Sequence, residues 1–430
     1  MDKKLPKVMA ICINAWRTDA TSHTLMNIFS CWQPERLSML YTRSDLPNTE
    51  VCSRFFQISE NDVLKSVFKP WINTGREVFN TEQVEVSQTE EEHARYAKAH
   101  KHHSPLLPLL REIVWWLGHW RSKELKRYID DVNPDLLFIP VYPVVYMGWV
   151  QRYVIKRTGK PYVCYLADDN YSYDSCKGVL SYIHRFFLRR EVKWLSTHCK
   201  EMFVIVEKEK EETDRSFGTN SVILTKGIDF SEKEYVEKAV GTPVKFVYTG
   251  SLIIGRSSTI ALLADAINKV NSEGVKATLD IYSGDDVDEA ISQRINRGAC
   301  KHRGLISREK VQEVQRDADV VVFAEALEGK EANIARLSFS TKITDYLSNG
   351  KCILAIGKEY IAPIDYFKRN DSALIATCEK EIEEKVVRIV NDPEIIKEYS
   401  RKAFECARRN HDKVTIDNRF IETMIRATNN

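Results

Sequence analysis

Residues 340–345 combine hydroxyls, an ammonium and a carboxylate where a short helix should begin. Ser340 and Thr341 are both suited to cap its first turn. Lys342 and Asp345 would project together from a face near the helix start. A helix N-terminus with a lysine beside it attracts phosphate and other anions. The spacing therefore predicts an anion site, and a capped surface helix with a Lys342–Asp345 ion pair is the alternative.

The neighbouring residues predict the elements that hold this helix. Ile343, Tyr346 and Leu347 recur at i, i+3 and i+4, so they should share a face that packs inward. Gly350 is suited to end the helix, and the apolar run 352–356 is typical of a buried strand. The sequence thus predicts a loop, a helix and a strand in succession.

Strand-like apolar runs alternate with helical patterns along the chain, which predicts an α/β protein with doubly wound parallel sheets. The runs lie near 8–13, 37–41, 55–58, 134–140, 161–166, 202–206, 222–224, 244–248, 277–282 and 319–323. A charged linker falls at about 231–241. We therefore expect an N-terminal domain over 1–232, a C-terminal domain over 233–400, and a helical segment over 401–430 that packs back on the first domain.

The composition narrows the function classes. Lysine and arginine number 63 against 61 acidic residues, and this balance argues against a nucleic-acid-binding protein. The ten cysteines are scattered without a C-x-x-C pair, so we expect neither a disulfide framework nor a zinc module. The first apolar run, 8–13, is too short for a signal sequence or a membrane span. A cytoplasmic protein fits these features.

Two patterns suggest metal sites but have simpler interpretations. Asp286-Val287-Asp288 resembles a manganese-binding pattern, yet its place before a helix favours a cap. A charged insertion from about 73 to 103 should be irregular, and no cysteine or acid completes a zinc set with its histidines, His100, His102 and His103. We therefore expect no metal site.

Residues 106–127 combine leucines and tryptophans with a basic run. The segment is too short to span a bilayer. It could lie at a membrane surface, with tryptophans at headgroup level and basic side chains beside anionic lipid. The alternative is a core helix with solvated basic residues. Peripheral membrane contact is thus one of two open interpretations.

Polar residues after strands of the first half are candidates for catalysis, in the case of Asp168 and Asp169, and for binding an acceptor. Asp168 and Asp169 follow a strand, where open α/β sheets bind ligands. They could orient a hydroxyl or stabilise positive charge, or they could simply cap a turn. Asn14, Arg17 and Thr21 lie in the first strand-to-helix loop and are further candidates.

Three segments of the second half resemble the donor-binding domain of retaining GT-B glycosyltransferases, and glycosyltransferase family 4 in particular. They are residues 247–252, 304–320 and 341–351. The resemblance implies two Rossmann-like domains that face a central cleft. It also implies a nucleoside-diphosphate sugar donor, a glycan or lipid-linked acceptor, and a role in polysaccharide or glycoconjugate synthesis.

The resemblance assigns roles to particular residues. The donor site would be lined by Gly250, Ser251, Ser340, Thr341 and Asp345. Arg256 and Lys342 would neutralise the diphosphate, and Asp345 would contact the ribose. Transfer would retain the sugar's configuration through front-face attack, with no metal and no cofactor.

Two departures from the family pattern bear on function. Leu337 stands where the motif's first glutamate contacts the transferred sugar, and the lysine expected soon after Arg256 is missing. We assign that lysine's charge role to Lys342. The alternatives are a nucleotide-sugar epimerase of the same fold and a catalytically inactive GT-B binding or scaffold subunit.

Overall fold

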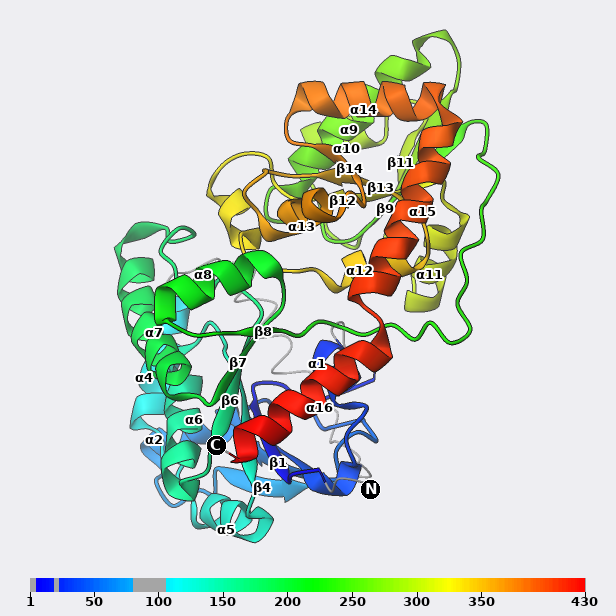
Figure 1. Cartoon of the computed structure of the whole chain (residues 1–430). Helices are drawn as coiled ribbons and strands as arrows, with labels where there is room; N and C mark the ends of the chain where they lie inside the picture. The colour runs from blue at the N-terminus through cyan, green and yellow to red at the C-terminus, as the bar shows by residue number, and fades with distance from the viewer. Residues whose placement is uncertain (1–4, 19–22, 80–105, 430) are drawn as a thin grey trace. The chain divides into compact units, whose positions relative to one another are not determined.

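The computed structural model describes residues 5–18, 23–79 and 106–429, which fall into two compact units (Figure 1). Unit 1 comprises Met1–Ile205, Lys210–Thr225 and Ile416–Asn430. Unit 2 comprises Val206–Glu209 and Lys226–Thr415. Each unit has its own sheet and its own apolar core.

Unit 1 has, among its described residues, an eight-stranded sheet in the order β4-β3-β2-β1-β5-β6-β7-β8. The strands in that order are Gly75–Val78, Arg54–Ile58, Leu37–Tyr41, Val8–Cys12, Leu136–Pro140, Tyr162–Leu166, Glu201–Val204 and Val222–Ile223. All neighbours pair in parallel except β3 and β4, which are antiparallel. The central strands are apolar throughout because helices cover both faces of the sheet.

The helices of this part of the chain are α1 (Thr24–Phe29), α2 (Glu60–Phe68), α4 (Leu106–Leu117), α5 (Lys123–Val132), α6 (Val145–Thr158), α7 (Gly178–His198), α8 (Glu207–Phe217) and α16 (Lys413–Asn429), with a short 3₁₀ turn, η1 (Pro34–Arg36). On one face, Phe29 of α1 meets Phe420 of α16 with ring centroids 5.0 Å apart. On the other, α6 packs against α7, and α4 contacts α2, α6 and α7.

Unit 2 has a six-stranded sheet, again among described residues, in the order β11-β10-β9-β12-β13-β14. These strands are Cys300–His302, Ala277–Tyr282, Val244–Thr249, Val320–Ala324, Cys352–Ile356 and Leu374–Ala376. All adjacent pairs are parallel. Both sheets are therefore doubly wound, as the alternation of elements predicts.

The helices of unit 2 are α9 (Arg256–Val270), α10 (Glu289–Ile295), α11 (Arg308–Asp317), α12 (Thr341–Ser348), α13 (Ala362–Asn370), α14 (Glu379–Asn391) and α15 (Pro393–Asn410), with 3₁₀ turns η2 (Asn271–Glu273) and η3 (Lys330–Ala335). The predicted loop, helix and strand around α12 are confirmed. Ser340 is its N-cap, Ile343, Tyr346 and Leu347 are buried, and Gly350 has φ +58°.

The boundary between the units lies before the charged linker at about 231–241, where the sequence suggested it. The boundary falls after Thr225 because Ile228 is already bound to the end of unit 2: its N–H donates to the His411 carbonyl at 2.7 Å, and it accepts from the Lys413 N–H at 2.9 Å. The C-terminal segment is split between the units. From Ile416 onward it belongs to unit 1, where Phe420 enters the core.

One expectation in the first half needs correction. Gly75–Val78 is not irregular but forms edge strand β4, because its residues pair with β3; the rest of the expected insertion, 80–103 with its three histidines, lies outside the described residues. Residues 106–127 form two helices, because Ser122 caps a separate α5. No helix in the described parts of the chain is long and apolar enough to cross a bilayer.

Candidate functional site

Lys342 lies at the first turn of α12, directly over the loop that follows β9. A Cβ placed on Gly250 would lie 2.2 Å from Lys342 Nζ, so the ammonium occupies the space that any other residue's side chain would need. Burial lowers the pKa of Lys342, and the nearby Arg256 lowers it further. The carboxylates of Glu325 and Asp285 act in the opposite direction. Four charged groups thus converge on one place.

The loop from β9 to α9 is held in a constrained shape. Ile254 has φ +59° and Gly255 has φ +74°, and a left-handed conformation costs a β-branched residue on the order of 1–2 kcal/mol. A Cβ on Gly255 would lie 2.8 Å from Ala326 Cβ, so the loop packs closely on the segment after β12. This packing sets Arg256, the first residue of α9, beside Glu325.

Arg256 and Glu325 form a two-point ion pair. Nε and Nη2 of Arg256 donate to the two carboxylate oxygens of Glu325 at 2.8 and 3.0 Å. Burial disfavours the charge on Arg256, but the Glu325 carboxylate outweighs burial and raises the arginine's pKa. Thr259 Oγ1 also donates to the Glu325 carbonyl at 2.9 Å. The guanidinium is thereby fixed in orientation at the start of α9.

Asp285, which follows β10, organises the glycine loop from the other side. Its carboxylate accepts from Ser251 Oγ and from the Leu252 N–H, both at 2.7 Å. Burial works to raise the pKa of Asp285, but the hydrogen bonds from Ser251, Leu252 and Ser283 lower it overall. The Ser251 hydroxyl is therefore used within the loop, and Asp285 keeps its charge.

Asp345 does not pair with Lys342. Its carboxylate is 2.6 Å from Nζ of Lys226, a residue far away in the sequence. The alternative interpretation of α12, a surface helix with an internal Lys342–Asp345 ion pair, is therefore wrong, because the Asp345 carboxylate pairs with Lys226. Among the residues that the structure describes, no carboxylate lies within ion-pair distance of Lys342.

Ser340 and Thr341 lie at the N-terminal end of α12. Ser340 Oγ accepts from the Lys342 N–H at 3.4 Å, and the Thr341 carbonyl accepts from Thr344 Oγ1 at 2.7 Å. The positive end of the helix dipole therefore lies beside the Lys342 ammonium. The structure brings six of the seven donor-domain candidates to this end of α12 and the β9–α9 loop, and Asp345 lies one turn further along the helix.

The carboxylates of unit 1 show a structural role more clearly than a chemical one. Asp169 is buried, and its carboxylate accepts from the Ser172 N–H at 2.9 Å and from the Ser172 hydroxyl. These bonds cap the turn after β6, which is the alternative that the sequence left open. Asp168 is exposed at the carboxyl end of β6.

The three candidate residues of the first strand-to-helix loop lie in different environments. Asn14 is exposed just beyond β1. Arg17 Nη1 donates to the Leu46 carbonyl at 2.7 Å, which ties this loop to the segment after β2. Thr21 lies outside the described residues. The carboxyl ends of β1 and β6 are separated in the sheet only by β5.

Reasoning from the sequence missed three charged residues of the unit 2 cluster. Glu325 directly follows β12, and Asp285 comes three residues after the end of β10. A polar residue beyond the carboxyl end of a parallel strand is the signal that could have found them. Lys226 comes three residues after β8 and carries the same signal, but its partner Asp345 is distant in sequence, so the pair itself could not be predicted. Asp288, by contrast, caps α10 by accepting from the Ile291 N–H at 2.9 Å, as expected.

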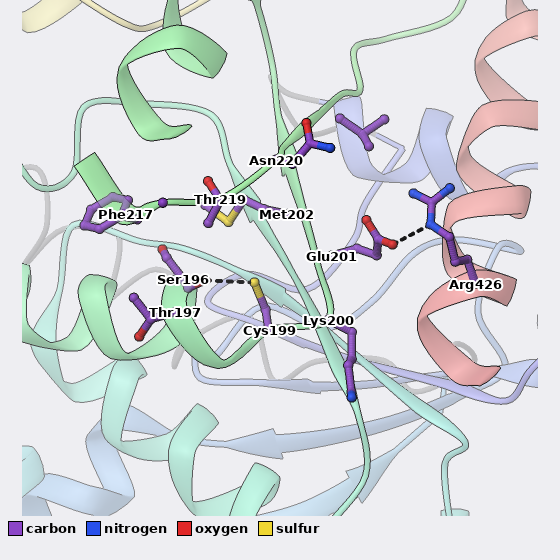
Figure 2. Close-up of a pocket in the computed structure, with 12 residues that line it drawn as sticks. Ser196, Thr197, Cys199, Lys200, Glu201, Met202, Phe217, Thr219, Asn220 and Arg426 are labelled. Atoms are coloured by element: carbon purple, nitrogen blue, oxygen red, sulfur yellow. Dashed lines mark hydrogen bonds and ion pairs between the residues drawn. The ribbon is translucent and has the colours of Figure 1, made fainter. Parts of the chain in front are cut away.

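A separate pocket of about 540 Å³ lies in unit 1 (Figure 2). It is lined by the end of α7, the amino ends of β7 and β8, and Arg426 of α16, which pairs with Glu201. Open α/β sheets bind ligands at the carboxyl ends of their strands, so this pocket lies at the other edge. It contains none of the candidate residues.

No family profile matches the sequence, and no curated protein matches it significantly. Solved structures do match. HepE of Anabaena, crystallised with UDP and glucose, has a TM-score of 0.61 at 11% identity over 97% of this chain and 99% of that chain. Sucrose-phosphate synthase of Thermosynechococcus elongatus has a TM-score of 0.61 at 11% identity, covering 96% and 97%.

The lipopolysaccharide outer core galactosyltransferase WaaB has a TM-score of 0.59 at 12% identity, covering 97% of this chain and 99% of that chain. Identities this low show the fold and nothing finer. The match spans both units in every case. The chain therefore has the two-domain GT-B fold of these structures.

Proposed function

We propose that unit 2 binds the nucleoside-diphosphate part of a sugar donor and that the chain transfers the sugar to an acceptor hydroxyl. The observation that carries this proposal is the position of Lys342. Its half-buried ammonium lies over Gly250 at the positive end of α12 without a carboxylate at ion-pair distance in the described structure. A cation held this way is ready to receive an anionic ligand.

The proposed chemistry follows from these charges. Breaking the sugar–phosphate bond leaves negative charge on the diphosphate, and Lys342, Arg256 and the α12 dipole would stabilise it. Arg256 would share its guanidinium between Glu325 and the phosphates, because a guanidinium carries more donors than one carboxylate uses. The retaining, metal-independent course rests on the resemblance to family 4. There the acceptor oxygen attacks from the face that the diphosphate leaves, and the diphosphate takes its proton.

Residue 337 would not contact the transferred sugar. Leu337 is fully buried in unit 2, so the motif position that bears a sugar-contacting glutamate is here part of the core. Asp345 remains the candidate for the ribose, although ligand binding would have to compete with its pair to Lys226. HepE is known in complexes with UDP and with UDP-glucose, which makes UDP the first nucleotide to test.

We propose that the acceptor is a glycan or a lipid-linked sugar, as in synthesis of surface polysaccharides. Asn14, Arg17 and Asp168 of unit 1 are the acceptor-side candidates, because they follow the carboxyl ends of β1 and β6. The galactosyltransferase WaaB, whose fold is shared, acts on lipopolysaccharide outer core by its name. A cytoplasmic location, inferred from the scattered cysteines, belongs to the same proposal.

Nucleotide binding can be tested by thermal shift with UDP, GDP and ADP. A ligand at 100 times its Kd should stabilise the protein by about 2.7 kcal/mol, which corresponds to a rise in Tm of roughly 5 °C or more. Lys342→Met keeps the apolar stem and removes the charge, so it should abolish the rise. Lys301→Met, at an exposed lysine of the same unit, is the matched control. No rise with any nucleotide would refute the donor site.

Turnover separates the proposed transferase from its two alternatives. Incubation with a panel of nucleotide sugars should release nucleoside diphosphate together with a glycosylated acceptor or free sugar of unchanged configuration. A free epimerised sugar would indicate the epimerase. Binding without turnover, across donors that raise Tm, would indicate a catalytically inactive subunit.

A further inference from the structure

Helix α7 of unit 1 exposes an apolar stripe that a helix normally buries. Val179, Tyr182, Ile183, Phe186 and Phe187 follow the spacing i, i+3, i+4, i+7 and i+8, which places them on one side of the helix. All five are exposed. The opposite side packs on the core through Leu188, Val192 and Leu195. The helix is therefore apolar on two sides over its first half.

Helix α4 likewise has one buried side and one exposed apolar side. Trp115 and Glu112 point inward and are buried, whereas Leu110, Ile113 and Trp116 are exposed, Trp116 to 71%. Helix α4 contacts both α2 and α7, which makes the three helices neighbours. Figure 1 shows α2, α4 and α7 gathered on the same side of the unit 1 sheet.

Helix α2 and the turn after it extend this surface. Phe68 is 78% exposed and Trp71 is 79% exposed. Single exposed apolar residues are common, but large contiguous apolar patches on a protein surface mark interaction sites. We call the exposed apolar side chains of α2, α4 and α7, together with Trp71, the α2–α4–α7 face.

A buried carboxylate holds the helices of this face in place. Glu112 of α4 accepts from the N–H groups of Val145 and Tyr146 at 2.9 and 2.7 Å, at the start of α6. His184 Nε2 of α7 lies 3.1 Å from the same carboxylate. Trp115 stacks on Tyr146 with centroids 4.3 Å apart. The apolar stripes are thus held in fixed positions by polar contacts beneath them.

The charges around the face are mostly basic. Lys177, Arg190 and Lys193 are exposed on or beside α7, and Lys65 and Lys69 are exposed on or beside α2. The acids of α4 and α7 are turned inward or paired: the one acid of α4 is the buried Glu112, and the one acid of α7, Glu191, binds Arg152 at 2.7 Å. Asp174, in the turn before α7, is an exposed acid, so the basic residues outnumber the exposed acids on this side. On α2, Glu60 and Asp62 are half-buried in the first turn, and Asp62 pairs with Lys65.

We propose that unit 1 docks on an anionic lipid bilayer through the α2–α4–α7 face. Aromatic and aliphatic side chains flanked by exposed lysine and arginine match the two parts of such a surface, its acyl boundary and its negative headgroups. A symmetric contact with a second copy would place the basic flanks of one copy against those of the other, which electrostatics disfavours. The inference does not depend on nucleotide binding by unit 2.

Flotation of the whole chain with vesicles tests the proposal. The wild type should float with vesicles of phosphatidylcholine and phosphatidylglycerol, and more weakly with phosphatidylcholine alone. Ile183→Ser with Phe187→Ser should lower the partition coefficient at least about tenfold, because both side chains would leave the acyl boundary. Leu305→Ser with Val275→Ser removes two side chains of unit 2 that are 82% and 61% exposed, and should change nothing.

A second double variant, Arg190→Gln with Lys193→Gln, tests the electrostatic part of the binding. Each basic residue near an anionic surface contributes about fivefold, so this variant should lose about 25-fold on mixed vesicles and little on neutral ones. Circular dichroism and urea unfolding confirm that the variants fold. Unchanged flotation of the Ile183/Phe187 variant would overturn the proposal. So would a dimer in sedimentation without lipid that the same variant dissociates, since the face would then be a contact between copies.

Discussion

A methyl group added at Gly250 would displace the Lys342 ammonium without disturbing the fold. The added Cβ would lie 2.2 Å from Lys342 Nζ, whereas ordinary contact begins at 3.4 Å, so the ammonium must retreat by about 1.2 Å. The atom that clashes is the end of a flexible side chain, which can move, and the next contact, Tyr248 Oη at 3.3 Å, is only slightly closer than ordinary contact. Gly250 also has no positive φ, so alanine fits the backbone there and should lower the melting temperature of the free protein little or not at all.

The retreat should weaken binding of a nucleoside diphosphate. Moving a charge pair from about 3 to about 4.2 Å loses about 1.5 kcal/mol at an effective dielectric constant of about 20, and a broken charged hydrogen bond costs about 1.5–3 kcal/mol. We therefore expect Gly250→Ala to raise the Kd for UDP about 10- to 150-fold. Isothermal titration calorimetry measures this constant, and thermal unfolding of the free protein measures stability in parallel.

A double-mutant cycle makes the test specific. In a Lys342→Met background no ammonium remains to be displaced, so Gly250→Ala should add little further loss. Gly284→Ala is the matched control, because it adds a methyl to a neighbouring exposed loop whose nearest contact is the Leu305 side chain at 3.3 Å. Wild-type affinity in Gly250→Ala, or an equal loss with and without Lys342, would refute the reasoning.

Three further predictions concern the charges and packing of the two units. Glu325→Gln should tighten binding of nucleoside diphosphate, because it frees Arg256 and removes a negative charge from the site. In urea, the free energy of unfolding should fall by about 1–3 kcal/mol because the ion pair is broken. Weaker binding of the nucleotide would contradict this prediction. Burial lowers the pKa of His411 to about 4, so the unfolded chain takes up the proton first as the pH falls, and the free energy of unfolding should drop by about 3 kcal/mol between pH 6.5 and 4. His411→Gln should remove that part of the pH dependence in urea titrations, and an unchanged slope would assign it to other groups. Trp115→Ala should cost about 3–5 kcal/mol, but Trp116→Ala less than about 0.5 kcal/mol, because only the first side chain is fully buried; equal losses in urea unfolding would contradict the assignment of the two faces of α4.

The local elements around the candidate site could be predicted from sequence because their signals are short-range. Ser340, Gly350 and the spacing of Ile343, Tyr346 and Leu347 define α12 within a single stretch of chain. The strand Cys352–Ile356 has the predicted bounds. Caps and amphipathic spacing act between residues a few positions apart, so their effect survives whatever the rest of the chain does.

The burial of the two faces of α4 could not be predicted from the local sequence. Trp115 and Trp116 are adjacent and have the same chemistry, yet one is buried against Tyr146 and the other is largely exposed. The open choice between a core helix and a membrane-surface helix had no local answer, since α4 has an inner face of the first kind and an exposed apolar outer face. The neighbouring stripe on α7 became part of the same surface only through packing.

By itself, the sequence determined the α/β class, the succession of strands and helices, and the placing of basic and hydroxyl groups at the start of α12. The tertiary structure alone decided which charges meet. Asp345 pairs with Lys226 instead of Lys342, Arg256 is held by Glu325, and the space for the Lys342 ammonium exists because residue 250 has no side chain. Ion pairs and close contacts depend on distances of a few ångströms between residues far apart in the chain, and only the packed sheet and its loops set those distances.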